Sequence, residues 1–156
     1  MKKKLSLDDS PGFLVGQLAS RMQLQVDRAL ATKEVTAPQW TVLWILNSGH
    51  ATTPSDISDY LSMNTGAVTR LLDRMVAKNL IVRKADERDR RRIFLEMTPE
   101  AKALYPHLPP LVTEVVKQFF HDISAEDLTI FKQILLHAIN NGDSIQKNSS
   151  TTPGSL

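Results

Sequence analysis

Residues 53–97 decide the fold of this chain, and they read TPSDISDYLSMNTGAVTRLLDRMVAKNLIVRKADERDRRRIFLEM. Thr53 and Asp56 have the spacing of a helix capping box, and Pro54 lies in the first turn, where a helix tolerates proline. A tight turn follows this short helix, and Asn64 is a good N-cap for a second helix over residues 65–78. Apolar side chains recur on the second helix with helical spacing (Val68, Leu71, Leu72 and Met75). The stretch therefore predicts two helices joined by a tight turn.

The apolar period changes from 3.6 to 2 after the second helix. Residues 81–84 and 92–97 predict two short strands, and a charged loop joins them. Two helices followed by a charged hairpin are typical of a winged helix-turn-helix, whose second helix enters the major groove of DNA. The predicted fold class is mainly α with a small β-hairpin, a winged helix-turn-helix DNA-binding core plus a helical dimerisation region.

The predicted DNA-binding region covers residues 35–98, and helices are predicted on both sides of it. Residues 11–34 predict an N-terminal dimerisation helix, since they carry an apolar stripe at i+4 spacing (Leu14, Leu18, Met22, Val26 and Leu30). Residues 99–142 predict C-terminal dimerisation helices, broken by prolines at 106, 109 and 110 and ended by Gly142. Residues 1–10 are expected to form a flexible arm and residues 143–156 a disordered tail.

The charge of the chain is concentrated in one segment. The net charge is only +2, yet residues 70–92 contain nine basic and four acidic side chains. A basic segment on a mildly acidic body is typical of a nucleic-acid binder. The chain has no cysteine, no long apolar run, no zinc-type histidine spacing and no hydrolase or phosphate-loop motif. We therefore expect a cytoplasmic protein that is not an enzyme, needs no metal or cofactor and does not contact a membrane.

The candidate DNA-binding residues follow from the predicted elements. Small side chains at the start of the second helix would let it approach base edges closely, and Arg70 could reach guanine O6 and N7. The recognition-helix candidates are Asn64, Thr65, Gly66, Ala67, Thr69 and Arg70. The wing candidates are Arg88, Asp89, Arg90, Arg91 and Arg92, whose arginines suit the negative potential of a narrow minor groove. Asp89 is expected to orient the guanidinium of Arg91 through an ion pair.

Several of these motifs resemble the family of multiple-antibiotic-resistance regulators (MarR). The similar segments are QWTVL at 39–43, AVTRLLDRM at 67–75, KNLIVR at 78–83, and DRR at 89–91 followed by LEMTPEA at 95–101. The resemblance implies an obligate homodimer, a pseudo-palindromic double-stranded DNA operator, and release by a small, often aromatic, ligand. It also implies that Arg91 enters the minor groove, whereas this chain has Arg92 at a position where the family often has a small residue.

Two further interpretations stay open at the level of sequence. Trp40 and Trp44, one turn apart, could form the aromatic wall of an effector pocket with Arg21 as the partner of a ligand carboxylate, or they could pack in the core. As an alternative to a ligand-responsive repressor, the same fold could serve as an architectural DNA-binding protein or a protein-interaction module without an effector.

Overall fold

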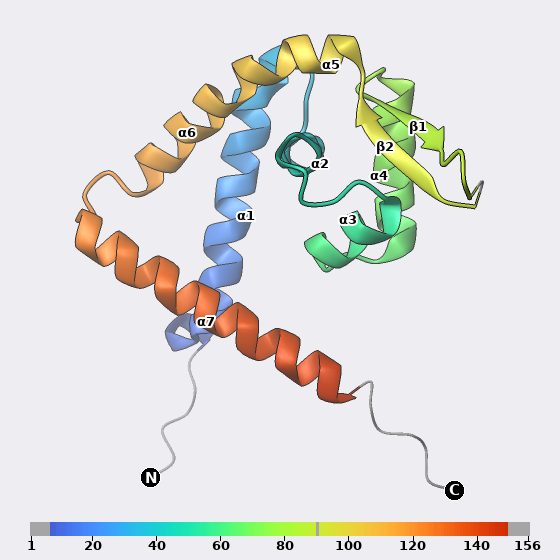
Figure 1. Cartoon of the computed structure of the whole chain (residues 1–156). Coiled ribbons are helices and arrows are strands. Elements are labelled where there is room, and N and C mark those ends of the chain that lie inside the picture. Colours follow the sequence, from blue (N-terminus) through green and yellow to red (C-terminus); the bar gives the residue numbers. More distant parts are fainter. Residues whose placement is uncertain (1–6, 90, 150–156) are drawn as a thin grey trace, which may run out of the picture. The chain divides into compact units, whose positions relative to one another are not determined.

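The structure is a computed structural model that describes residues 7–89 and 91–149. It separates into two compact units, one that extends to Phe119 and one that begins at Phe120 (Figure 1). The helices of the first unit are α1 (Pro11–Leu30), α2 (Ala37–Ser48), α3 (Pro54–Leu61), α4 (Thr65–Ala77), α5 (Pro99–Leu104) and α6 (Leu108–Phe119), with short 3-10 turns at Leu7–Asp9, Ala31–Lys33 and Tyr105–His107. Its strands are β1 (Ile81–Ala85) and β2 (Ile93–Met97). The second unit contains α7 (Ala125–Ser149).

The predicted helix signals lie where the helices begin and end. Thr36 and Thr53 each close a capping box at the start of α2 and α3, with Gln39 and Asp56 as the partners three residues on. Gly49 ends α2 in a left-handed conformation at φ 72°, which glycine adopts without steric strain. α2 therefore precedes the two helices joined by a tight turn that the sequence predicts.

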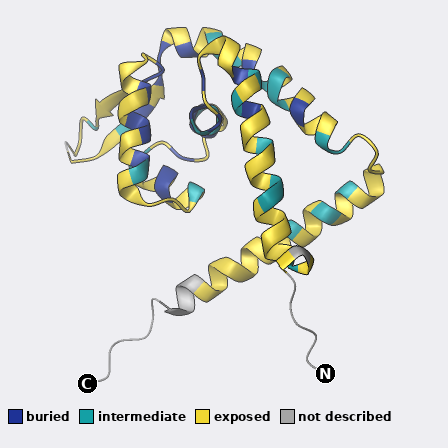
Figure 2. Cartoon of the chain, turned by 180° about the vertical axis from the view of Figure 1, so that it is seen from behind, coloured by how far each residue is buried: buried dark blue, intermediate teal, exposed yellow. Residues whose placement is uncertain are grey.

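The core of the first unit lies between α2, α3, α4 and the hairpin. The predicted apolar face of α4 is buried (Val68, Leu71, Leu72 and Met75), and it packs in one cluster with residues of α2 and α3 (Val42, Leu43, Ile45 and Ile57). Figure 2 shows the buried positions gathered on these elements, whereas α7 is exposed along most of its length. The mostly helical fold with one antiparallel hairpin confirms the predicted fold class.

Two aromatic residues of α2 and α3 keep a large part of their surface exposed. Trp44 keeps 38% and Tyr60 keeps 48% of its surface accessible. Successive helical residues are rotated by about 100° around the helix axis. Trp44 therefore lies on the side of α2 opposite to the one that carries the buried residues Val42, Leu43 and Ile45. Both rings pack against His50, with centroid distances of 5.2 Å for Trp44 and 5.6 Å for Tyr60.

The hairpin pairs antiparallel and is tied to the helices at its base. Ile81 lies opposite Met97 and Ala85 opposite Ile93. The N–H of Leu95 donates to the carbonyl oxygen of Thr52 at 2.8 Å, which attaches β2 to the segment before α3. Thr98 is buried, and its hydroxyl donates to the Asn79 carbonyl oxygen at 2.7 Å. The hairpin is therefore held to the end of α4 and to the start of α5.

The C-terminal half confirms one prediction and corrects two others. The prolines end α5 at Leu104 and place a 3-10 turn before α6, as expected from their missing N–H groups. Gly142, expected to end the last helix, instead lies inside α7, which continues to Ser149. A glycine in a helix interior costs only about 1 kcal/mol relative to alanine, and the Ser144 hydroxyl donates to the Asn140 carbonyl oxygen at 3.0 Å across it. Residues 143–149 are therefore helical, and residues 150–156 lie outside the described residues.

The structure describes only the last residues of the predicted N-terminal arm. Residues 7–9 form a 3-10 turn, and the N–H of Ser10 donates to the carbonyl oxygen of Leu7 at 3.0 Å. Residues 1–6 lie outside the described residues. None of the helices in the described part of the chain combines the length and apolar character needed to cross a bilayer.

Candidate nucleic-acid interface

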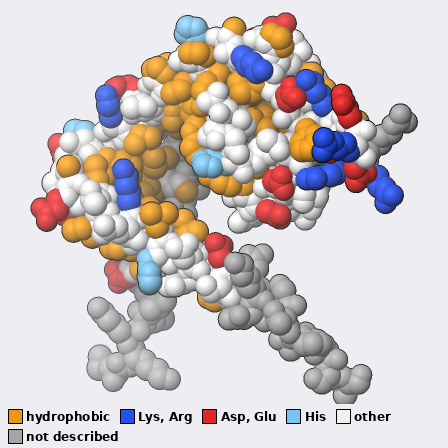
Figure 3. Space-filling view, viewed as in Figure 1, with side chains coloured by type: hydrophobic (Ala, Val, Ile, Leu, Met, Phe, Trp, Pro, Cys, Tyr) orange, Lys and Arg blue, Asp and Glu red, His pale blue; other side chains and the backbone are white. Residues whose placement is uncertain are grey.

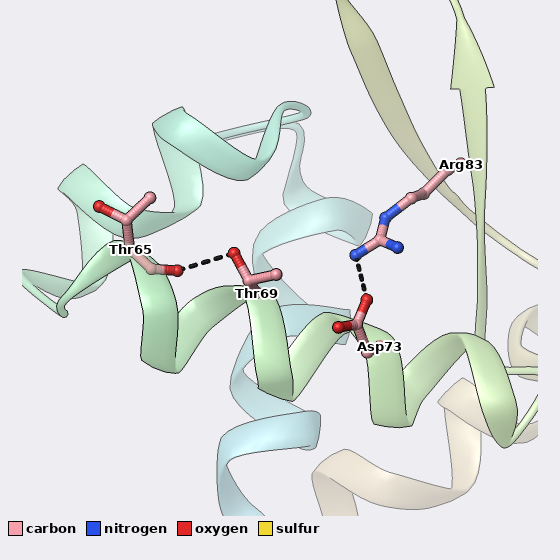
Figure 4. Close-up of polar contacts among 4 residues, drawn as sticks. All are labelled: Thr65, Thr69, Asp73 and Arg83. Atoms are coloured by element: carbon pink, nitrogen blue, oxygen red, sulfur yellow. Dashed lines mark hydrogen bonds and ion pairs between the residues drawn. The ribbon is translucent and has the colours of Figure 1, made fainter.

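The N-terminal turn of α4 presents small and polar side chains. Asn64 caps the helix, and its Oδ1 accepts a hydrogen bond from the Gly66 N–H at 2.8 Å. Thr65, Gly66, Thr69 and Arg70 are exposed, and Ala67 is half-buried. The Thr69 hydroxyl donates to the Thr65 carbonyl oxygen at 2.9 Å, so both threonines lie along one side of the helix (Figure 4). The structure thus brings together the predicted recognition-helix residues on one accessible surface.

Gly66 leaves room for its two neighbours on this surface. A Cβ atom at this position would lie 3.1 Å from Asn64 Oδ1 and 3.6 Å from a terminal guanidinium nitrogen of Arg70. The guanidinium of Arg70 therefore extends back over the first turn of α4. A cation at this place adjoins the helix N-terminus, where free N–H groups also suit a phosphate.

The wing loop is shaped by two aspartates that accept hydrogen bonds from the backbone. Asp86 Oδ1 accepts from the Arg88 N–H at 2.8 Å, and Asp89 Oδ1 accepts from the Arg91 N–H at 3.1 Å. The Asp86 N–H donates to the Arg92 carbonyl oxygen at 2.9 Å, which closes the loop. We expected the Asp89 carboxylate to pair with the Arg91 guanidinium. It binds the Arg91 backbone instead, because a short aspartate side chain reaches the N–H two residues later in an Asx turn.

The wing arginines differ in their surroundings. The guanidinium carbon of Arg92 lies 5.6 Å from the centre of the Phe94 ring, within the range of a cation–π contact. Arg88 and Arg91 are exposed, and Arg90 lies outside the described residues. Figure 3 shows Lys and Arg side chains gathered over the hairpin, with acidic side chains among them. Arg92 therefore packs on the hairpin through Phe94, although both Arg91 and Arg92 are exposed.

Sequence reasoning did not identify the link between α4 and the hairpin. Arg83 on β1 forms an ion pair with Asp73 on α4, with 2.7 Å between Nη2 and Oδ1 (Figure 4). Asp73 follows Thr65 and Thr69 at i+4 spacing, so it continues their row along the helix. This spacing was the signal in the sequence that could have suggested a role for Asp73.

An apolar pocket lies beside the DNA-binding elements in the first unit. It has a volume of about 480 Å³, and its apolar lining includes Met22 and Val26 of α1, Trp40 of α2, and Val112 and Val116 of α6. Trp40 also stacks on Tyr105 with 5.5 Å between the ring centres. Of the three ligand candidates from the sequence, Trp40 lines this pocket, whereas Arg21 and Trp44 do not.

Comparisons with known proteins agree with this arrangement. Residues 35–93 match the model of the MarR family. The multiple antibiotic resistance protein MarR of Salmonella typhimurium is 30% identical over 92 residues, which are 59% of this chain and 62% of that protein. This alignment therefore spans less than two thirds of that relative. The transcriptional regulator PecS of Dickeya dadantii is 29% identical, with 86% of this chain and 87% of PecS covered.

Solved structures of similar fold include a variant of Escherichia coli MarR in complex with operator DNA. Its TM-score is 0.78 at 23% identity, and the match covers 87% of this chain and 99% of that chain. BpsR of Bordetella bronchiseptica, described for the regulation of its DNA binding by 6-hydroxynicotinic acid, has a TM-score of 0.78 at 19% identity, over 87% of this chain and 97% of BpsR. The match to the MarR family model thus covers the DNA-binding region at residues 35–93, and the chain shares the fold of these solved structures.

Proposed function

We propose that this protein is a sequence-specific DNA-binding transcriptional regulator. The observation that carries the proposal is the surface of α4, where exposed small residues and Arg70 lie at the helix N-terminus beside a basic hairpin. Small side chains let a helix approach base edges in the major groove, and a bidentate arginine distinguishes guanine. The recognition-helix set Asn64, Thr65, Gly66, Ala67, Thr69 and Arg70 is therefore assigned to the major groove.

The wing is assigned to the minor groove that flanks each recognition helix. Arg91 is the inserted side chain, because Arg92 packs on Phe94 and a narrow minor groove attracts an extended arginine. Arg88 is assigned to a phosphate. The Asx turns at Asp86 and Asp89 hold the loop that carries these arginines.

The active form is proposed to be a homodimer on a pseudo-palindromic operator. Each unit exposes large apolar side chains that a monomer in water would leave uncovered. They include Leu14 and Leu24 on α1, and Ile130, Ile134 and Ile139 on α7. Two-fold symmetry would pair identical faces and present two copies of α4. We expect an obligate interface, which typically buries more than about 2,000 Å².

A small ligand is proposed to release the protein from DNA, which would make it a repressor. The apolar pocket with Trp40 in its wall has a volume of about 480 Å³, which lies within the range of small-molecule sites. Its lining combines α1, α2 and α6, so an occupant would contact both the proposed dimerisation helices and the DNA-binding core. An aromatic ligand fits the apolar lining, and the regulation of BpsR DNA binding by 6-hydroxynicotinic acid supports this class.

Selection of bound sequences from random DNA tests the proposed function. A regulator enriches one two-fold symmetric sequence and binds it about 10³-fold or more tightly than competitor DNA at physiological salt. An architectural protein would bind DNA without enriching a sequence, and a protein-interaction module would not bind DNA. Either result would contradict the proposal.

A further inference from the structure

The ion pair between Asp73 and Arg83 lies on the surface that is assigned to DNA. Asp73 is the only acidic residue of α4, and it continues the exposed row of Thr65 and Thr69. A lone carboxylate on a helix in the major groove would be repelled by the phosphates. Asp73 does not stand alone, since Arg83 reaches it from β1 with 2.7 Å between Nη2 and Oδ1 (Figure 4).

Arg83 lies between two elements that are assigned to DNA, and this position indicates that it faces the sugar-phosphate backbone. A helix in the major groove and a wing in the adjacent minor groove have one sugar-phosphate strand between them. Arg83 lies on β1 at the base of the wing and contacts the helix, so it bridges the elements on either side of that strand. Its side chain keeps 35% of its surface exposed, and its hydrogen bond to Asp73 uses one of the five N–H donors of a guanidinium.

We propose that Arg83 is a further DNA-contacting residue that binds a backbone phosphate, and that Asp73 is the positioning residue that aims it. This inference rests on the proposed function of the chain as a DNA-binding regulator. The Asp73 carboxylate holds one edge of the planar Arg83 guanidinium against α4. The other N–H groups of the guanidinium then face away from the helix. An arginine whose geometry is fixed loses less freedom when it binds a phosphate than a free one.

The same hairpin offers a matched control. Lys84, the next residue on β1, forms an ion pair with Glu96 of β2, also at 2.7 Å. Because successive side chains of a strand point to opposite faces, Lys84 lies on the face of the hairpin away from Arg83. The two pairs have the same N–O distance, although Lys84 keeps 58% of its side-chain surface exposed against 35% for Arg83.

The test measures affinity for the selected operator, as a function of salt, for Arg83→Ala, Asp73→Ala, Lys84→Ala and the exchanged pair Asp73→Arg/Arg83→Asp. We expect Arg83→Ala to bind about 10-fold more weakly and to flatten the salt slope by about 2 units per dimer, one for each lost phosphate contact. Lys84→Ala is expected to keep the slope of the wild type. Asp73→Ala is expected to weaken binding although it removes a negative charge near DNA.

The exchanged pair distinguishes two roles of the ion pair: positioning Arg83 for a phosphate, and only linking α4 to β1. It keeps the link between α4 and β1, so urea unfolding should resemble that of the wild type, yet its cation lies on the helix and DNA binding should stay weak. Restored affinity and slope in the exchanged pair, or wild-type slope in Arg83→Ala, would overturn the proposal. Tighter binding by Asp73→Ala would overturn the positioning role. If the wild type enriched no sequence from random DNA, the proposed function itself would fail. That outcome is distinct from the variant results that would overturn the roles of Arg83 and Asp73.

Discussion

At the scale of single residues, Arg70 and Arg88 are assigned different tasks. Arg70→Ala should cost about 1–3 kcal/mol on the operator and relax the preference at one base pair per half-site, because a bidentate guanine contact is lost. Arg88→Ala should weaken binding to all sequences alike and flatten the salt slope by about 1–2 units per dimer. Titration of both variants against the operator and its single-base variants checks this division. The same uniform loss for both would contradict it.

Asp89 provides a second test at this scale. Its Oδ1 accepts from the Arg91 N–H at 3.1 Å, and an asparagine oxygen can make the same hydrogen bond. We therefore expect Asp89→Asn to bind DNA as well as the wild type or better, since it also removes a negative charge. Asp89→Ala should weaken binding by about 0.5–1.5 kcal/mol, the value of a lost hydrogen bond. A loss in Asp89→Asn equal to that in Asp89→Ala would support an ion pair with the guanidinium instead.

Residue-level prediction from the sequence was best where local spacing determines the conformation. The caps Thr53 and Asn64 and the buried face of α4 follow from short-range rules, and the structure has them. The partner of Asp89 was not predictable in the same way, because a backbone N–H two residues away competes with a flexible guanidinium. Asp73 and Arg83 are ten residues apart and meet only when the hairpin folds against α4.

At the scale of elements, Thr98 joins α4, the hairpin and α5. Its buried hydroxyl donates to the Asn79 carbonyl oxygen at 2.7 Å and accepts from the Ala101 N–H at 3.0 Å. Thr98→Val should lower the free energy of unfolding by about 1–3 kcal/mol, because it leaves buried polar groups without partners. Urea unfolding monitored by circular dichroism measures this loss.

Thr129 supplies the control for that substitution. Its hydroxyl donates to the Ala125 carbonyl oxygen at 2.8 Å on the exposed surface of α7. Thr129→Val should change stability by no more than about 0.5 kcal/mol, as is usual for surface substitutions. Equal effects of the two substitutions would show that Thr98 does not hold the elements together.

The limits of sequence reasoning at this scale have physical causes. Helix periodicity left open whether Trp44 packs in the core, since one apolar pattern fits several rotations of a short helix, and the structure leaves 38% of its surface exposed. Gly142 suggested a helix end, but helix termination by glycine needs a left-handed φ. The positive φ angles among the described residues occur at Gly49 and at Glu34, Ser62 and Asn79, and not at Gly142.

At the scale of the whole molecule, the homodimer is the form proposed to bind DNA. Ile134 of α7 has 61% of its surface exposed in the single chain. Ile134→Glu should shift the protein toward monomer in sedimentation at micromolar concentration, because it would bury a charge in an apolar interface. The neighbouring exposed residue gives a control of equal charge, and Gln133→Glu should leave the dimer intact. A wild-type protein that sediments as a monomer would contradict the proposed assembly.

In the proposed complex, two copies of α4 occupy successive major grooves while the wings contact the flanking minor grooves. Guanine-N7 methylation interference combined with hydroxyl-radical footprinting on the selected operator measures both contacts at once. We expect N7 interference in two half-sites centred about 10 base pairs apart, one helical turn, with protected minor grooves on their outer sides. Uniform protection without interference at any guanine, or interference confined to one unrepeated site, would contradict it.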